Sequence, residues 1–79
     1  MSRRQLAAEY VPKLLRDCNS GENNPLPEWY ITQAAGINGH VYPIVDRALA
    51  TLVRDGDIKT RTRIAQRDTF ESKETVYWI

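Results

Sequence analysis

The chain has 79 residues, with 11 basic and 10 acidic side chains, so its formal net charge at pH 7 is only +1. A chain this short makes one domain over residues 1–79, and its single cysteine, Cys18, excludes an intrachain disulfide. No stretch approaches the roughly 18 apolar residues of a transmembrane helix, and no apolar signal core follows the N-terminus. We therefore expect a cytoplasmic protein that does not insert into a membrane.

A first amphipathic helix is predicted from about residue 3 to residue 18. Ser2 and Gln5 have the spacing of a capping box at its start. Its apolar positions recur every three or four residues: Leu6, Ala7, Tyr10, Val11, Leu14, Leu15 and Cys18. Pro12 falls inside this stripe without changing its phase, which predicts one bent helix rather than two. The polar cluster of residues 19–25 forms a turn that ends it.

A second helix is predicted over residues 27–35. Pro27 suits its first turn, and Gly36 is expected as a left-handed C-cap. Its buried contacts are expected to be Trp29, Ile31 and Ala35. An extended conformation at residues 29–31 is the competing prediction, because such aromatic and β-branched residues favour strands.

A third helix follows the turn at residues 37–39, with Asn38 as its N-cap, and ends at Asp55-Gly56. Pro43 falls near its first turn, where proline is tolerated. The inner face of this helix is predicted to consist of Val41, Ile44, Val45, Ala48, Leu49, Leu52 and Val53.

The pattern then changes to a period of two, which predicts strands over residues 58–65 and 74–79. Ile58, Thr60, Thr62 and Ile64 would share one face, whereas Lys59, Arg61 and Arg63 would share the other. Residues 66–73 are expected to form a long hairpin loop. One core is predicted to contain Leu6, Val11, Leu14, Leu15, Val45, Ala48, Leu49, Leu52, Ile58 and Trp78.

This order of elements resembles the winged helix-turn-helix family. The residues that carry the resemblance are Ala34–Ile37 at the turn, Val45–Leu52 in the third helix, and then Asp55–Ile58 and Val76–Ile79. The resemblance implies a small α+β fold, in which three helices precede a C-terminal β-hairpin wing. It also implies binding of double-stranded DNA, in transcription regulation or as an accessory factor in replication or recombination. Because one such helix usually needs a second copy for affinity, a homodimer is expected.

Two groups of side chains are candidates for DNA binding. In the third helix, the candidates for reading the major groove are His40, Tyr42, Arg47, Thr51 and Arg54. In the wing, the candidates for contacting phosphates are Lys59, Arg61, Arg63, Arg67 and Lys73. Alternate residues of a strand are about 6.6 Å apart, close to the spacing of phosphates along one DNA strand. A solvated helix face and an edge strand protected by charge are the structural alternatives.

A protein-interaction module with the same fold is the alternative function. The near-neutral charge, the acidic Asp46 in the third helix and the exposed aromatic residues Tyr42 or Phe70 favour it. A small phage- or plasmid-type inhibitor of a larger complex would have these features. The single His40 and single Cys18 provide no zinc-ligand spacing, and no catalytic or phosphate-binding motif is present. We therefore expect neither an enzyme nor a bound cofactor or metal.

Overall fold

The computed structural model describes residues 6–67 and 70–79. Within them the helices are α1 (Ala7–Asp17), α2 (Glu28–Ile37) and α3 (Tyr42–Arg54), and the strands are β1 (Leu26–Pro27), β2 (Lys59–Arg67) and β3 (Phe70–Trp78). The strands form an antiparallel sheet in the order β1-β3-β2. The prediction of a small α+β fold, with three helices before a C-terminal hairpin, is confirmed.

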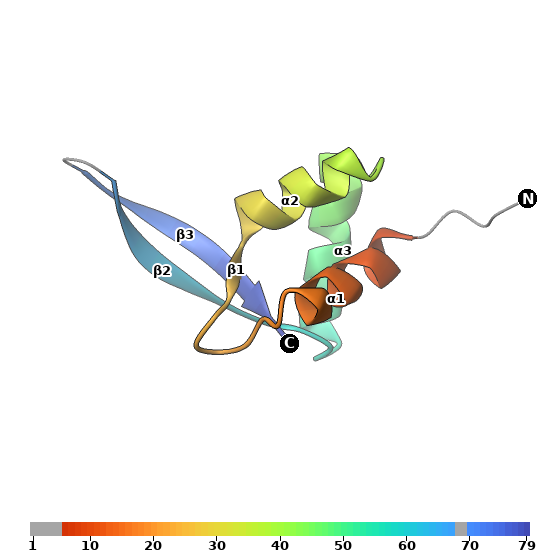
Figure 1. Ribbon diagram of the computed structural model, residues 1–79, viewed down its shortest axis with the longest axis horizontal. Coiled ribbons are helices and arrows are strands. Elements are labelled where there is room, and N and C mark those ends of the chain that lie inside the picture. Colours follow the sequence, from red (N-terminus) through yellow and green to blue (C-terminus); the bar gives the residue numbers. More distant parts are fainter. Residues whose placement is uncertain (1–5, 68–69) are drawn as a thin grey trace, which may run out of the picture.

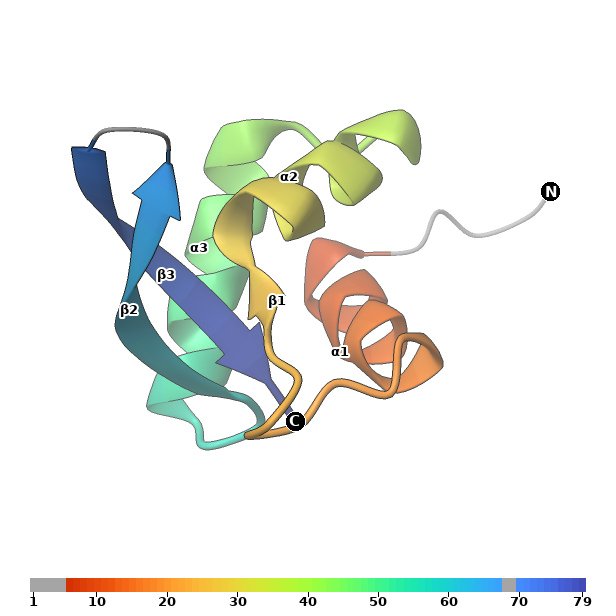
Figure 2. The same cartoon turned by 60° about the vertical axis from the view of Figure 1, so that its left-hand side comes forward.

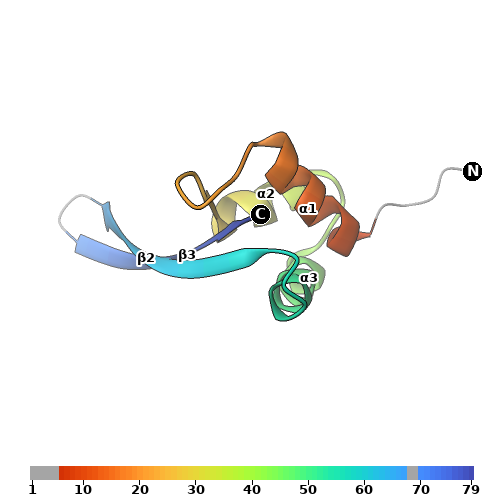
Figure 3. The same ribbon diagram turned by 90° about the horizontal axis from the view of Figure 1, so that it is seen from below.

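The helices pack together as one body, and the hairpin of β2 and β3 extends away from it (Figure 1). Helix α3 lies behind α1 and α2 in Figure 1 and beneath them in Figure 3. In the part of the chain that the structure describes, no helix is both long and apolar enough to cross a membrane.

The described helices all end in the same way. One residue has φ in the left-handed region, and the backbone N–H of the next residue bonds to a carbonyl of the helix. The left-handed residues are Asn19, Gly39 and Gly56, with φ of 52°, 87° and 79°. In each case the next N–H bonds to a carbonyl five residues earlier, at 2.9 Å: Ser20 to Leu15, His40 to Ala35, and Asp57 to Leu52. This Schellman geometry satisfies carbonyls at the end of each helix and fixes the direction of the chain that follows.

The start of α1 differs from the prediction. Leu6 is extended, with ψ of 150°, so the helix begins at Ala7 rather than near residue 3. The predicted capping box of Ser2 and Gln5 lies outside the described residues. Pro12 lies inside one uninterrupted helix, as its phase predicted.

The turn between α2 and α3 also differs from the prediction. Helix α2 continues through Gly36, and the left-handed residue is Gly39 instead. Asn38 is the C-cap of α2 and not the N-cap of α3, which is Val41. The Asn38 side chain donates to the Ala34 carbonyl at 2.9 Å and to the Tyr10 hydroxyl at 3.0 Å. The Asn38 amide therefore caps a carbonyl near the end of α2, and its bond to Tyr10 connects that end to α1.

The sheet contains a strand that was not predicted and a longer hairpin than was predicted. Leu26 and Pro27 pair with Tyr77 and Val76, so β1 lies beside β3 and leads directly into α2 (Figure 2). The competing prediction of an extended segment at residues 29–31 is wrong, since these residues are helical. The β2–β3 ladder runs from Lys59–Trp78 to Arg67–Phe70. The predicted long loop over residues 66–73 is therefore wrong, because only residues 68 and 69 separate the strands.

The core lies between the helices and the sheet. Its buried cluster contains Val11, Leu15, Ile31, Ala35, Val45, Leu49, Leu52, Ile58 and Tyr77. Leu6 was predicted to be buried but is 55% exposed, because it precedes the helix and does not share its phase. Tyr77 takes the core position predicted for Trp78, since neighbouring residues in a strand point to opposite faces. Trp29, Val41 and Ile44 are also exposed, against the prediction.

Candidate functional site

Helix α3 has an uncovered outer line on the side away from the core. Val45, Ala48, Leu49 and Leu52 are its buried residues. Pro43, Arg47, Ala50 and Arg54 follow one another at three- and four-residue intervals on the opposite side, and all are exposed. We call these four residues the α3 outer line. Ala50 is the smallest of them, so the exposed side of the helix presents one arginine on each side of a short side chain.

A groove separates the α3 outer line from the hairpin. It has a volume of about 490 Å³, and it is lined by Asp46, Leu49, Ala50, Val53, Arg54, Thr60, Arg61, Thr62, Thr75 and Tyr77. Three threonines from β2 and β3 form its hairpin wall, where their hydroxyls can donate or accept hydrogen bonds. The Thr60 hydroxyl already donates to the Val76 carbonyl at 2.9 Å.

The charges of this groove are unevenly distributed along α3. Arg54 lies near the C-terminal end of the helix, and Asp46 lies one turn from its start. Burial raises the pKa of the Tyr77 phenol, and the nearby carboxylates of Glu28 and Asp46 raise it further. Positive charge therefore occupies the C-terminal part of the groove, whereas negative charge occupies the part nearest α2.

Of Lys59, Arg61 and Arg63 in β2, Arg61 is among the residues that line this groove. Thr60 is opposite Tyr77, which packs in the core with Leu49 of α3. Because side chains alternate along a strand, Lys59, Arg61 and Arg63 lie on the other face of the sheet. The predicted sharing of faces is thus consistent with the structure. Arg54 of α3 and Arg61 of β2 both border the groove, although strand alternation places the Arg61 side chain on the sheet face opposite Thr60 and Thr62.

Arg61 is held by contacts within the protein. Its guanidinium lies over the Trp78 ring, 5.4 Å from the centroid. Its Nη2 also donates to the Glu22 carbonyl, in the segment between α1 and β1, at 3.2 Å. Arg61 therefore connects the hairpin to the segment that precedes the sheet.

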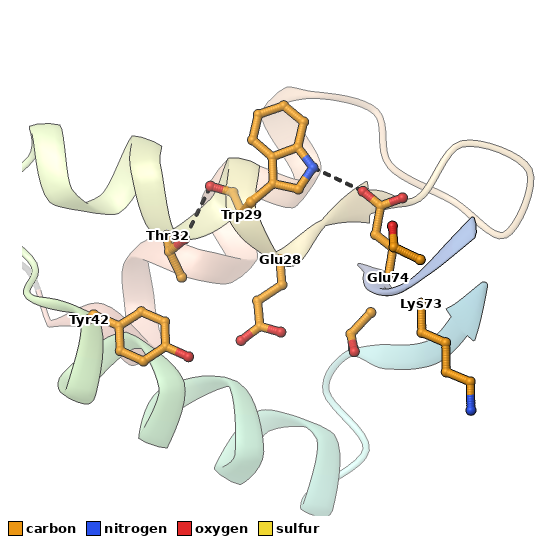
Figure 4. Close-up of a pocket in the computed structure, with 8 residues that line it drawn as sticks. Glu28, Trp29, Thr32, Tyr42, Lys73 and Glu74 are labelled. Atoms are coloured by element: carbon orange, nitrogen blue, oxygen red, sulfur yellow. Dashed lines mark hydrogen bonds between the residues drawn. The ribbon is translucent and has the colours of Figure 1, made fainter. Parts of the chain in front are cut away.

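Arg63 takes part in a second connection, centred on Glu74. Arg63 Nε donates to Glu74 Oε2 at 3.1 Å, and Trp29 Nε1 donates to Glu74 Oε1 at 2.9 Å. The Glu74 side chain is only 12% exposed. Figure 4 shows the indole of Trp29 directed at this carboxylate from the start of α2. Glu74 thus joins both hairpin strands to the helical body, a contact that no local pattern in the sequence indicated.

The other predicted wing residues are less constrained. Lys59 and Lys73 are exposed. Lys73 and Ile64 are partners in the ladder, and Lys73 points away from the neighbouring Glu28 in Figure 4. Arg67 pairs through its backbone with Phe70, but both side chains lie outside the described part of the chain.

The remaining residues predicted for the third helix are divided among different surroundings. His40 precedes α3, and its ring centroid is 5.2 Å from that of Tyr10. Thr51 and Arg47 border a shallow hollow of about 280 Å³ between α3 and the start of α1. Tyr42 is 59% exposed and, together with Glu28, lines a separate pocket between α2 and the hairpin. Four of the predicted residues therefore lie on α3, whereas His40 lies in the preceding turn; the four are Tyr42, Arg47, Thr51 and Arg54.

A second pocket lies between α2, the start of α3 and the edge of β3. It has a volume of about 340 Å³, and its lining residues are Glu28, Trp29, Thr32, Tyr42, Ser72, Lys73, Glu74 and Thr75. The Glu28 carboxylate and the Tyr42 hydroxyl point into it from two helices (Figure 4). Over residues 6–67 and 70–79, no three side chains of His, Cys, Asp or Glu gather in a way that could hold a metal ion.

Comparisons with protein-family models, with curated proteins and with solved structures found no match to this chain.

Proposed function

We propose that the protein is a small winged helix domain that binds double-stranded DNA, with α3 in the major groove and the hairpin near the backbone. The observation that carries this proposal is the α3 outer line, on which Arg47 and Arg54 are exposed on either side of Ala50. Seven residues of helix span about 10 Å, or about three steps along a DNA strand. Two guanidinium groups at this distance can each donate a pair of hydrogen bonds to a guanine edge or a phosphate.

The hairpin has a different part in this proposal from that of α3. Arg61 and Arg63 have partners within the protein, so we assign the phosphate contacts first to the exposed Lys59 and Lys73. Arg61 still offers charge at the surface, and its stacking on Trp78 orients the guanidinium. Thr62 and Thr75 in the groove supply hydroxyls of the kind that position proteins on phosphates.

The biological role proposed for this domain is transcription regulation, or an accessory function in replication or recombination, in the cytoplasm. A single reading helix gives modest affinity, so the proposal includes binding as a homodimer or as cooperating copies.

The test is DNA binding by fluorescence anisotropy with mixed genomic fragments at about 50 and about 200 mM salt. The wild-type protein should bind, and its affinity should fall steeply with salt. The variant Arg47→Gln with Arg54→Gln should lose about tenfold or more in affinity.

The matched control carries Lys13→Gln with Arg16→Gln. These residues are exposed on α1, away from the α3 outer line, and the change in net charge is identical. We expect the control to bind within about twofold of the wild type. Equal losses in the two variants, or no binding at the lower salt, would contradict the proposal.

A protein-interaction module is the second candidate function. Around the start of α3, Val41, Tyr42 and Ile44 are 57%, 59% and 52% exposed, and together they make an apolar surface of the kind that contacts other proteins. A small phage- or plasmid-type inhibitor of a larger complex would use such a surface. Absence of DNA binding in the experiment above, with a correctly folded protein, would favour this candidate.

A further inference from the structure

Helix α2 is apolar on its outer side as well as on its inner side. Its sequence, EWYITQAAGI, contains one charged residue, Glu28. Ile31 and Ala35 are its buried residues, yet on the other side Trp29 is 52% exposed and Ile37 is 81% exposed. A surface helix ordinarily carries polar side chains on that side, and a helix that is apolar all round is ordinarily covered.

The exposed side of α2 is a continuous surface. Trp29, Tyr30, Gln33, Ala34 and Ile37 line a shallow hollow of about 320 Å³, and we call this set the α2 stripe. The rings of Trp29 and Tyr30 meet edge to face, with centroids 6.1 Å apart. Because the Trp29 indole also donates to Glu74, its position is fixed before any partner arrives. A fixed side chain loses little conformational entropy on binding.

We propose that a second copy of this chain covers the α2 stripe, with the two α2 helices antiparallel about a two-fold axis at Gln33. Trp29 lies four residues before Gln33 and Ile37 lies four residues after it. An antiparallel two-fold arrangement therefore places the aromatic end of each stripe against the aliphatic end of the other, twice. An amide has both donors and an acceptor, so Gln33 can bond to its own copy at the axis.

The chemistry of the stripe favours a second copy over a charged partner. None of its five residues carries a charge, so an acidic or basic peptide would find no complementary group there. Ala34 is small and lets a second helix approach closely. The outer line of α3 is on another side of the helical body, since α3 lies behind α2 in Figure 1 and beneath it in Figure 3. Association through α2 would leave α3 free.

The size of the stripe sets the expected strength. A ten-residue helix is about 15 Å long, and a contact between two such helices buries less than the about 800 Å² per partner of a standard interface. We therefore expect weak association, with a dissociation constant of about 10–200 µM. The proposal does not rest on DNA binding, and its test contains no DNA.

The first test is sedimentation velocity from about 5 to about 500 µM protein. The wild type should pass from monomer to dimer over this range, whereas Ile37→Lys should remain monomeric. Ile64→Lys is the matched control, because Ile64 is 65% exposed on the hairpin and lies outside the stripe. It should associate like the wild type. A monomeric wild type at the highest concentration, or an unchanged dimer in Ile37→Lys, would overturn the proposal.

The second test locates the axis by cross-linking. In a Cys18→Ser background, Gln33→Cys places one thiol per chain at the proposed axis, and mild oxidation should join the two copies. A disulfide requires Cβ atoms about 3.5–4.5 Å apart, so only positions near the axis react readily. Lys13→Cys in the same background is the control on exposed α1. Cross-linking of Gln33→Cys at no more than the control rate would overturn the proposed arrangement.

Discussion

The arginines of α3 and the arginines of β2 have the same chemistry but different surroundings. Within the described residues, Arg54 is paired only with the adjacent Asp55 at 3.4 Å, and the Arg54 side chain is 77% exposed. Arg63 bonds to Glu74, and its side chain is 42% exposed. Arg61 stacks on Trp78 and bonds to the Glu22 carbonyl.

This difference separates arginines that are available to a ligand from arginines that hold the fold together. An exposed ion pair such as Arg54–Asp55 contributes about 0–1 kcal/mol and is readily exchanged for a phosphate. Arg61 bonds to Glu22 in the segment before the sheet. Arg63 bonds to its cross-strand partner Glu74, which also accepts from Trp29 of α2, so both contacts help to orient the hairpin. In this protein, the row of basic residues along β2 therefore indicates a ligand site less strongly than the exposed side of α3 does, although α3 carries fewer basic residues.

The largest expected effect concerns the anchoring of α3. Leu49 is 1% exposed in the core cluster, directly beneath the α3 outer line. Leu49→Ala should lower the free energy of unfolding by about 2–5 kcal/mol, because it leaves a cavity. Urea denaturation measures this loss. Arg47→Ala, on the exposed side of the same helix, should change stability by less than about 0.5 kcal/mol. Similar losses of stability in both variants would contradict the assignment of Leu49 to the core and of Arg47 to the exposed side of α3.

The second effect tests whether Glu74 attaches the hairpin to the helical body. Glu74→Ala should lower stability by about 1–3 kcal/mol, since it removes the acceptor of both Trp29 and Arg63. Tryptophan fluorescence should also change as the Trp29 indole loses its acceptor. Glu71→Ala is the control, because Glu71 is exposed on the same strand. An unchanged melting temperature in Glu74→Ala would refute this role.

The sequence predicted the features that follow a local period. The inner face of α3 from Val45 to Leu52 repeats at helical spacing, and the alternation of Lys59, Arg61 and Arg63 repeats at strand spacing. Both were correctly assigned because burial on one side of an element leaves that period in the sequence.

Features that depend on partners far away in the sequence produce no such periodic pattern, so they were not predicted. Strand β1 has two residues, Leu26–Pro27, and only the Tyr77 and Val76 backbone makes it a strand. Most residues of the 66–73 segment are polar in the sequence, so this segment resembled a loop. Backbone pairing needs no apolar side chains, and the true length was therefore hidden.

The residues of the candidate site also differ in whether a local pattern or a distant partner determines their role. Arg47 and Arg54 were identified from the helical face alone, and they are exposed on it. The contact between Trp29 and Glu74 spans 45 positions, and that between Arg61 and Glu22 spans 39. Nothing local distinguishes an arginine with such a partner from a free one.

A third effect distinguishes the role of α3 from that of the hairpin, through the preference of the protein for particular DNA sequences. If Arg47 reaches a base edge, Arg47→Ala should cost about 1–3 kcal/mol of discrimination at one base pair. Binding to a panel of duplexes, each with one base pair changed, measures this loss. Lys59→Ala should instead weaken binding to every duplex by a similar factor. A uniform loss in Arg47→Ala would move this arginine from base reading to phosphate contact.

The smallest effects separate the two possible roles of Arg61. As a phosphate contact, its removal in Arg61→Ala should lower the slope of log affinity against log salt by about one unit. As a structural contact, its removal should lower stability by about 0.5–1 kcal/mol, because both the stacking on Trp78 and the bond to Glu22 are lost. Lys59→Ala is the comparison, since Lys59 is exposed on the same strand face. We expect Lys59→Ala to change the salt slope alone, and Arg61→Ala to change stability in addition. A change in slope without any change in stability for Arg61→Ala would remove the distinction between the arginines of α3 and those of β2.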